Sequence, residues 1–248
     1  MTTDLVFEFD DLFDGDYLYF YEETLTAERN AADVDTICRL LALQPEQSVL
    51  DLGCGHGRIA NALAQRGARV TGLDRAGHFL EMARRDAAVL GVNVNYVLGD
   101  MREIAWNETF DCVFLWFTTF GYFSERENEL VLERAVRALK SGGRLLIEQI
   151  NRNALLVANF PLRQIIRRGD DLMIDLVDYD GLVDRSQTER VIVRNGTVRS
   201  ARYTVRLYSF GELSRLLKAF GMTSTEAFGQ GGSPYTLYGR RIITVAMK

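Results

Sequence analysis

Cysteine and histidine are scarce in this sequence. It has three cysteines and two histidines among 248 residues, and no two cysteines have the Cys-x-x-Cys spacing. An odd number of scattered cysteines fits neither a disulfide framework nor a zinc site. We therefore expect a reduced, cytoplasmic protein that binds no metal.

An excess of basic residues is also missing, and so is any long apolar stretch. The 29 lysines and arginines are outnumbered by 34 acidic residues, which gives a net charge of −5. Proteins that bind nucleic acid usually carry a basic surface, so we expect no nucleic-acid partner. No apolar run is long enough to span a bilayer, and residues 1–10 lack the basic start of a secretory signal. We expect no membrane partner either.

Prolines are too few to mark a linker, since the three lie at positions 45, 161 and 234. Over residues 28–159, apolar strand-like runs alternate with helical patterns, which predicts a mostly parallel sheet covered by helices on both faces. Over 160–208 the alternation breaks, and strand patterns with an Asn195-Gly196 turn predict an inserted antiparallel β-layer. Residues 209–248 return to a helix and a closing strand. The predicted fold class is α/β, a doubly wound sheet with that insertion.

Residues 1–27 precede the predicted sheet and combine aromatic with acidic side chains. Such a terminal segment has little to pack against until a ligand offers an apolar wall, which predicts a lid that orders over the site. The inserted layer 160–208 is assigned to substrate binding or to contacts between copies of the chain. A homo-oligomer is therefore one expectation.

Acidic residues and glycines gather where the predicted parallel strands end. Asp51 opens a glycine-rich run after the first strand, Asp74 ends the second strand, and Asp100 follows the third. Ligands bind beyond the carboxyl ends of strands in such a sheet, and carboxylates can accept hydrogen bonds from ribose hydroxyls or an adenine amino group. Arg58 stands where a dinucleotide-binding loop needs its third glycine, and no phosphate-binding lysine loop is present. The pattern favours a nucleoside without phosphates, although a tight turn and a helix cap are the structural alternatives.

Four segments, in order, resemble the motifs of class I S-adenosylmethionine-dependent methyltransferases of the small-molecule, natural-product-tailoring type. They are Val49–Arg58, Val70–Asp74, Gly99–Met101 and Ser141–Ile147. The resemblance covers residues 28–150 well and the C-terminal segment more loosely. It implies a Rossmann-like, seven-stranded sheet whose last strand runs antiparallel. It also implies S-adenosylmethionine as methyl donor and S-adenosylhomocysteine as product.

The same resemblance implies which residues hold the cofactor. Backbone groups of the glycine loop would contact the methionine part, Asp74 the ribose, and Asp100 the adenine edge. Arg29 would pair with the methionine carboxylate. The full set expected to bind the cofactor is Arg29, Asp51, Gly53, Cys54, Gly55, Asp74, Arg75, Asp100, Met101 and Leu115.

Two aromatic clusters flank the predicted methyl donor, one near the N-terminus and one after the fourth strand. Aromatic walls exclude water and attract the electron-poor sulfonium carbon. Tyr17 and Phe117 are the expected catalytic residues, the first orienting the acceptor and the second walling it in. Residues expected to bind the acceptor are Tyr19, Tyr21, Trp116, Phe120 and Glu148. Core packing is the alternative for the second cluster, and Glu148 is open to two interpretations, a cap on the sheet end or a base.

An amine nitrogen of a secondary metabolite, as in antibiotic biosynthesis, is the expected acceptor, methylated by direct displacement. A hydroxyl must lose its proton during attack and usually needs a histidine or a metal nearby, whereas both histidines here are expected on the donor side. O-methylation of a small-molecule hydroxyl is the alternative. Two further classes stay open: a nicotinamide-dependent oxidoreductase, and a protein that binds S-adenosylmethionine without turnover.

Overall fold

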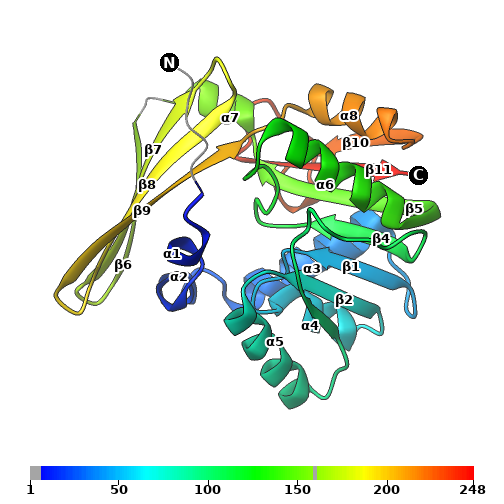
Figure 1. The fold of residues 1–248 in the computed structure, drawn as a ribbon, viewed down its shortest axis with the longest axis horizontal. Helices are drawn as coiled ribbons and strands as arrows, with labels where there is room; N and C mark the ends of the chain where they lie inside the picture. Colours follow the sequence, from blue (N-terminus) through cyan, green and yellow to red (C-terminus); the bar gives the residue numbers. More distant parts are fainter. Residues whose placement is uncertain (1–6, 159–160) are drawn as a thin grey trace.

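The computed structural model describes residues 7–158 and 161–248, and its central element is a seven-stranded sheet (Figure 1). The strand order is β10-β11-β5-β4-β1-β2-β3, and only β11 runs against the others. The predicted seven-stranded, mostly parallel sheet is therefore confirmed. Its strands are β1 (Ser48–Leu52), β2 (Arg69–Asp74), β3 (Asn95–Leu98), β4 (Phe110–Leu115), β5 (Leu139–Ile150), β10 (Ser224–Phe228) and β11 (Arg241–Met247).

Helices cover both faces of this sheet. On one face lie α3 (Ala27–Leu41), α4 (Arg58–Gln65) and α5 (Gly77–Leu90); on the other lie α6 (Glu125–Ala138) and α8 (Phe210–Ala219). Neighbouring residues of β1 show the division. Val49 packs in the core on the side of α3, α4 and α5, and Leu50 packs in the core on the side of α6 and α8. Successive strand residues point to opposite faces, so a continuous apolar strand supplies two cores at once.

A second, four-stranded antiparallel sheet is inserted between β5 and α8, as expected from the sequence. It consists of β6 (Leu162–Arg168), β7 (Asp171–Asp180), β8 (Arg185–Arg194) and β9 (Thr197–Arg206). Asn195 and Gly196 both have positive φ, 51° and 73°, which suits the tight turn between β8 and β9. The strands β6 and β10 and the helix α7 (Arg152–Leu156) were not predicted. A 3₁₀ turn also forms at Gln230–Gly232.

The N-terminal segment lies between the two sheets (Figure 1). It forms α1 (Phe9–Leu12) and α2 (Gly15–Tyr21), and we call residues 7–25 the lid. Residues 1–6 of the expected lid, and residues 159–160 where the expected insertion begins, lie outside the described part of the chain. The lid is bound to the inserted sheet by ion pairs, since Arg199 contacts both Asp14 and Asp16 and Arg194 also contacts Asp16.

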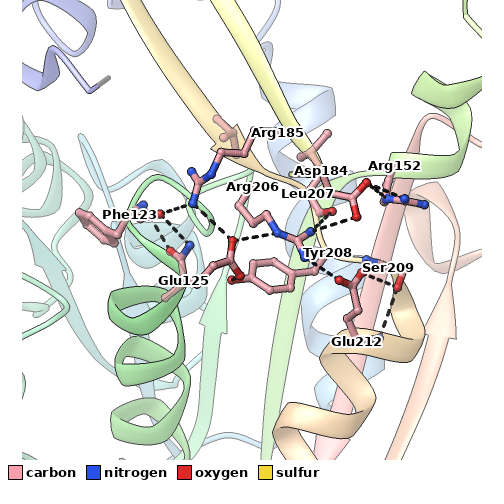
Figure 2. Close-up of polar contacts among 12 residues, drawn as sticks. Phe123, Glu125, Arg152, Asp184, Arg185, Arg206, Leu207, Tyr208, Ser209 and Glu212 are labelled. Atoms are coloured by element: carbon pink, nitrogen blue, oxygen red, sulfur yellow. Dashed lines mark hydrogen bonds and ion pairs between the residues drawn. The ribbon is translucent and has the colours of Figure 1, made fainter. Parts of the chain in front are cut away.

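A polar cluster joins the root of the inserted sheet to the helices of the central fold (Figure 2). The Arg206 guanidinium lies between two carboxylates, with Nε 2.9 Å from Glu125 of α6 and Nη2 2.5 Å from Glu212 of α8. Arg185 donates to the Phe123 carbonyl at 2.7 Å. These bonds attach β8 and β9 to the helices of the central fold. The lid therefore lies between two sheets that are connected to each other.

Candidate active site

A cavity opens where β1, β2, β3 and β4 end, beneath the lid. Its walls are the loops that follow these four strands together with aromatic rings of residues 7–17, and its empty space including the mouth is about 1000 Å³. Parallel strands end at one edge of a sheet, which is why loops far apart in sequence converge there.

The glycine-rich loop after β1 forms the floor of the cavity. Gly53 has φ +76°, and a Cβ placed on it would lie 2.1 Å from Cγ2 of Thr119, so only glycine fits. Gly55 has φ +55°, and a Cβ there would meet no atom within 4 Å because the position faces open space. The first glycine therefore lets the loop pack against the end of β4, and the second leaves backbone exposed to a ligand.

Asp74, at the end of β2, holds this loop while facing the cavity. Its Oδ2 accepts a hydrogen bond from the Gly55 N–H at 2.7 Å, and its Oδ1 accepts one from Ala76 at 2.8 Å. Burial raises the pKa of this carboxyl, although the backbone donors oppose that effect. A carboxylate has about four acceptor positions. Asp74 can therefore accept ribose hydroxyls while it keeps the loop in place.

Asp51 contributes a buried carboxylate to the same wall. It is 3% exposed and lines the cavity. Burial raises its pKa to about 8; Arg58 opposes this and Asp74 adds to it, and no hydrogen-bond donor among the described residues contributes. A buried carboxylate without a donor is costly, so this group is suited to accept an ammonium.

Asp100 is held in place by its neighbour Arg102. Its Oδ1 accepts from the Arg102 backbone at 2.8 Å and from Nε at 3.0 Å, and its Oδ2 accepts from Nη2 at 2.7 Å. Burial would raise the pKa of Asp100, but these bonds outweigh it and the pKa is lowered. The carboxylate is thus kept charged and oriented at the cavity wall.

The other residues expected to bind the cofactor divide into two groups. Cys54, Arg75 and Met101 line the cavity, with the Arg75 guanidinium 4.2 Å from the ring centre of Phe9 in the lid. Arg29 and Leu115 are not among the lining residues. Arg29 is exposed, and Leu115 is fully buried in β4.

Among the residues expected on the acceptor side, Tyr17, Trp116 and Phe117 line the cavity. Tyr21 lies behind Tyr17, with ring centres 4.6 Å apart. Tyr17 and Tyr21 are one helical turn apart and therefore share a face of α2.

Tyr19, Phe120 and Glu148 lie elsewhere. Tyr19 is on the opposite face of α2, between Arg168 and Arg194, whose guanidiniums are 4.3 and 3.8 Å from its ring centre. Phe120 is buried in the core, 5.2 Å from the Tyr208 ring. Glu148 is also buried, and its carboxylate binds the Phe117 N–H and Arg241. None of the three lines the cavity. Tyr19 points away from it on the far side of α2, and Phe120 and Glu148 are turned into the interior.

His56 and Tyr122 are among the lining residues that sequence reasoning did not assign to the site. His56 lines the donor side; burial, assisted by Arg58, lowers its pKa to about 4. Tyr122 lines the acceptor side, and Phe7 of the lid stacks on it with ring centres 4.6 Å apart. Tyr122 belongs to the aromatic run after β4, so composition gave a signal there; the pairing with Phe7 had none.

The donor end of the cavity fits S-adenosylmethionine. The Asp51 carboxyl, which has no hydrogen-bond donor among the described residues, could accept a methionine ammonium. Asp74 has acceptor positions left for ribose hydroxyls, and the Gly55 backbone is uncovered. Within residues 7–158 and 161–248, no three metal-ligating side chains come together. In the same ranges, every helix is too short or too polar to cross a bilayer.

Comparison with known proteins agrees with this geometry. Residues 49–143 match the methyltransferase domain family. The cypemycin N-terminal methyltransferase of Streptomyces sp is 28% identical over 203 residues, covering 80% of this chain and 82% of that protein. A ubiquinone biosynthesis O-methyltransferase of Erwinia tasmaniensis is 32% identical over 136 residues, covering 51% of this chain and 54% of the relative.

Solved structures extend the likeness to the whole fold. The sugar N-methyltransferase KedS8 from Streptoalloteichus sp ATCC 53650 superimposes with a TM-score of 0.73 at 18% identity, covering all of this chain and 98% of that one. The matched domain spans the loop that carries Asp51 and the strand end that carries Asp74. Together with the cavity at those strand ends, the match over residues 49–143 identifies an S-adenosylmethionine-dependent methyltransferase that is similar to the class I enzymes.

Proposed function

We propose that the enzyme methylates an amine nitrogen of a small natural-product metabolite. The observation that carries this proposal is the acceptor end of the cavity, which is walled by aromatic rings and where no side chain of the described residues is suited to remove a proton near neutral pH. An amine can shed its proton to water before it attacks, whereas a hydroxyl needs a base beside it.

Two phenols at that end, and the histidine on the donor side, support the proposal. Burial raises the pKa of the Tyr17 hydroxyl, and burial likewise raises the pKa of Tyr122 well above its usual value. Both phenols therefore stay protonated and can only orient the acceptor. His56 is neutral, but a pKa of about 4 makes it a weak base. Orientation is thus the main contribution that these residues can make.

Orientation is sufficient for this chemistry. S-adenosylmethionine supplies an electrophilic methyl group on a positively charged sulfur. The protein must hold a lone pair in line behind that methyl group, and holding two reactants in place is worth up to about 7–11 kcal/mol of the barrier. Tyr17 presents a hydroxyl that is not hydrogen-bonded to any described residue, and Phe117 closes the wall beside it.

Two of the relatives point the same way, since one is named for N-terminal methylation and another for sugar N-methylation. O-methylation is the second candidate, because one relative is an O-methyltransferase and His56 lies in the cavity. A shift of the His56 pKa on binding a phenol or alcohol would favour that candidate.

The test measures S-adenosylhomocysteine release with matched acceptor sets: peptides with free N-terminal amines, amino sugars, and phenols or alcohols of the same size. Mass spectrometry and NMR then locate the new methyl group. We expect transfer to nitrogen, with a rate that rises with pH up to the acceptor's own pKa.

Three variants sharpen this test. We expect Tyr17→Phe to lower kcat modestly, Phe117→Gly to lower it strongly through lost positioning, and His56→Ala to leave transfer to an amine largely intact. A methyl group found on oxygen, together with loss of that activity in His56→Ala, would show that the amine assignment is wrong.

A further inference from the structure

Phe117 and Thr118, just after β4, adopt a backbone conformation that non-glycine residues rarely take. Their φ values are +63° and +59°, in the left-handed region, and neither is glycine. Such a conformation is unfavourable, most of all for a β-branched residue such as threonine, and it persists only where surrounding groups hold it. Two such residues in succession therefore need hydrogen bonds from neighbouring groups to stabilise them.

Glu148 of β5 accepts hydrogen bonds from both residues. Its Oε2 accepts a hydrogen bond from the Phe117 N–H at 2.8 Å, and its backbone carbonyl accepts one from the Thr118 N–H at 3.2 Å. Both consecutive amides of the turn are thus bound by one residue of the neighbouring strand.

Arg241 of β11 completes the arrangement. Its guanidinium forms a two-pronged ion pair with the Glu148 carboxylate, and its Nη2 donates to Thr118 Oγ1 at 2.7 Å. Arg241 and Glu148 lie on adjacent, hydrogen-bonded strands, so the central sheet itself sets their separation. Both carboxylate oxygens of Glu148 are occupied, and the residue does not line the cavity.

We propose that Glu148 and Arg241 are positioning residues, which hold the Phe117 ring against the site of methyl transfer by fixing the left-handed turn. Phe117 and Thr118 line the cavity, whereas Glu148 reaches it only through the backbone of these two residues. Glu148 is therefore not the base that removes a proton from the acceptor. This assignment does not depend on whether the acceptor is an amine or a hydroxyl.

Three substitutions separate positioning from the other roles. Glu148→Gln keeps an oxygen that can accept the Phe117 N–H, whereas Glu148→Ala removes it. Thr118→Gly makes one of the two left-handed positions easy to adopt, because glycine takes positive φ without strain. Positioning predicts that the glutamine variant retains most function, that the alanine variant loses it, and that adding Thr118→Gly to Glu148→Ala restores part of it.

The first measurement needs no acceptor. Trp116 lines the cavity next to Phe117, and a Trp106→Phe background leaves Trp116 as the single tryptophan. Its emission then follows titration with S-adenosylhomocysteine. We expect Glu148→Ala to weaken binding about tenfold, as for the loss of one hydrogen bond to a charged group. With an acceptor from the screen above, kcat should fall more than KM rises.

Glu212→Gln is the matched control, since Glu212 of α8 also pairs with a buried arginine, Arg206, but neither residue lines the cavity. It should leave both binding and kcat unchanged, and melting temperatures of all variants show that each is folded. Equal loss in Glu148→Gln and Glu148→Ala would identify a base and overturn the proposal. Normal binding and kcat in a folded Glu148→Ala, or no gain from Thr118→Gly, would also overturn it.

Discussion

The Arg190 guanidinium binds both oxygens of the Asp175 carboxylate, at 2.7 and 2.8 Å, inside the four-stranded sheet. Each residue is only 5% exposed. The same guanidinium lies 3.4 Å from the Tyr21 hydroxyl, so the pair supports the helix that carries Tyr17. Because this ion pair is buried, its removal should change the free energy of unfolding by a measurable amount.

Removing one member of this pair should be strongly destabilising. Arg190→Met or Asp175→Leu leaves the other charge buried and unpaired, at an expected cost of about 3–5 kcal/mol in the free energy of unfolding. The double variant should recover most of that loss, because no charge remains. Urea denaturation gives the three values. Arg66→Met, which breaks the exposed pair with Asp35, is the control and should change stability by less than about 1 kcal/mol.

Asp74→Ala should weaken S-adenosylhomocysteine binding by roughly 1.5–3 kcal/mol, because buried ribose hydroxyls and the Gly55 N–H lose a charged acceptor. Asp74→Asn, which keeps one oxygen, should lose less. Calorimetry measures both, and Asp86→Ala on the exposed face of α5 is the control. Unchanged affinity in Asp74→Ala would remove this residue from the cofactor site.

Cofactor binding should release protons near pH 7. In the cofactor-free protein burial raises the Asp51 pKa to about 8, so the carboxyl is mostly protonated below that pH. A bound ammonium favours the charged carboxylate and lowers the pKa. Affinity should therefore rise as pH increases toward 8 and level off above it. Calorimetry in buffers of different ionisation enthalpy measures the protons released, and Asp51→Asn should bind more weakly with no such pH dependence.

Attachment of the lid should weaken in acid. Burial would raise the Asp16 pKa, but its bonds to Arg199 and Arg194 lower it below the usual value. The stabilisation is therefore complete above the unfolded value of about 4 and is lost as pH falls through the lowered pKa. Hydrogen exchange over residues 7–25 should quicken in that range, and Asp16→Asn should show fast exchange already at neutral pH. Equal exchange in the variant and the wild type would mean that ring contacts alone hold the lid.

The parts of the site that sequence could predict are those formed locally. Gly53 and Gly55 needed positive φ, and Asp51, Asp74 and Asp100 each stand at a strand end, so a parallel sheet was enough to bring them together. The strand β6 was missed because arginine and glutamine fill over half of an exposed edge strand, which hides the apolar pattern. In β10 the sequence Ser-Thr-Glu-Ala-Phe gives only a weak strand signal.

Other features depend on partners far along the chain. Asp16 and Arg199 are 183 residues apart, and nothing local indicates their contact. Tyr19 was grouped with Tyr17 by composition, but helix geometry points it to the other side. The left-handed turn at Phe117 and Thr118 had no sequence signal at all, because Glu148 and Arg241 impose it from two other strands.

The attachment of the lid bears on how the substrate specificity of such an enzyme could be changed. The lid takes its ion pairs from the four-stranded sheet, while it meets the cofactor-binding fold mainly through rings such as Phe9 on Arg75 and Tyr17 on Phe79. Two stretches far apart in the sequence, residues 7–25 and 162–206, are therefore joined by ion pairs into one unit. A chimaera that exchanges only one of them would break the ion pairs of Asp14 and Asp16, whereas exchanging both would keep those pairs. We predict that only the double exchange transfers the choice of acceptor between two such enzymes.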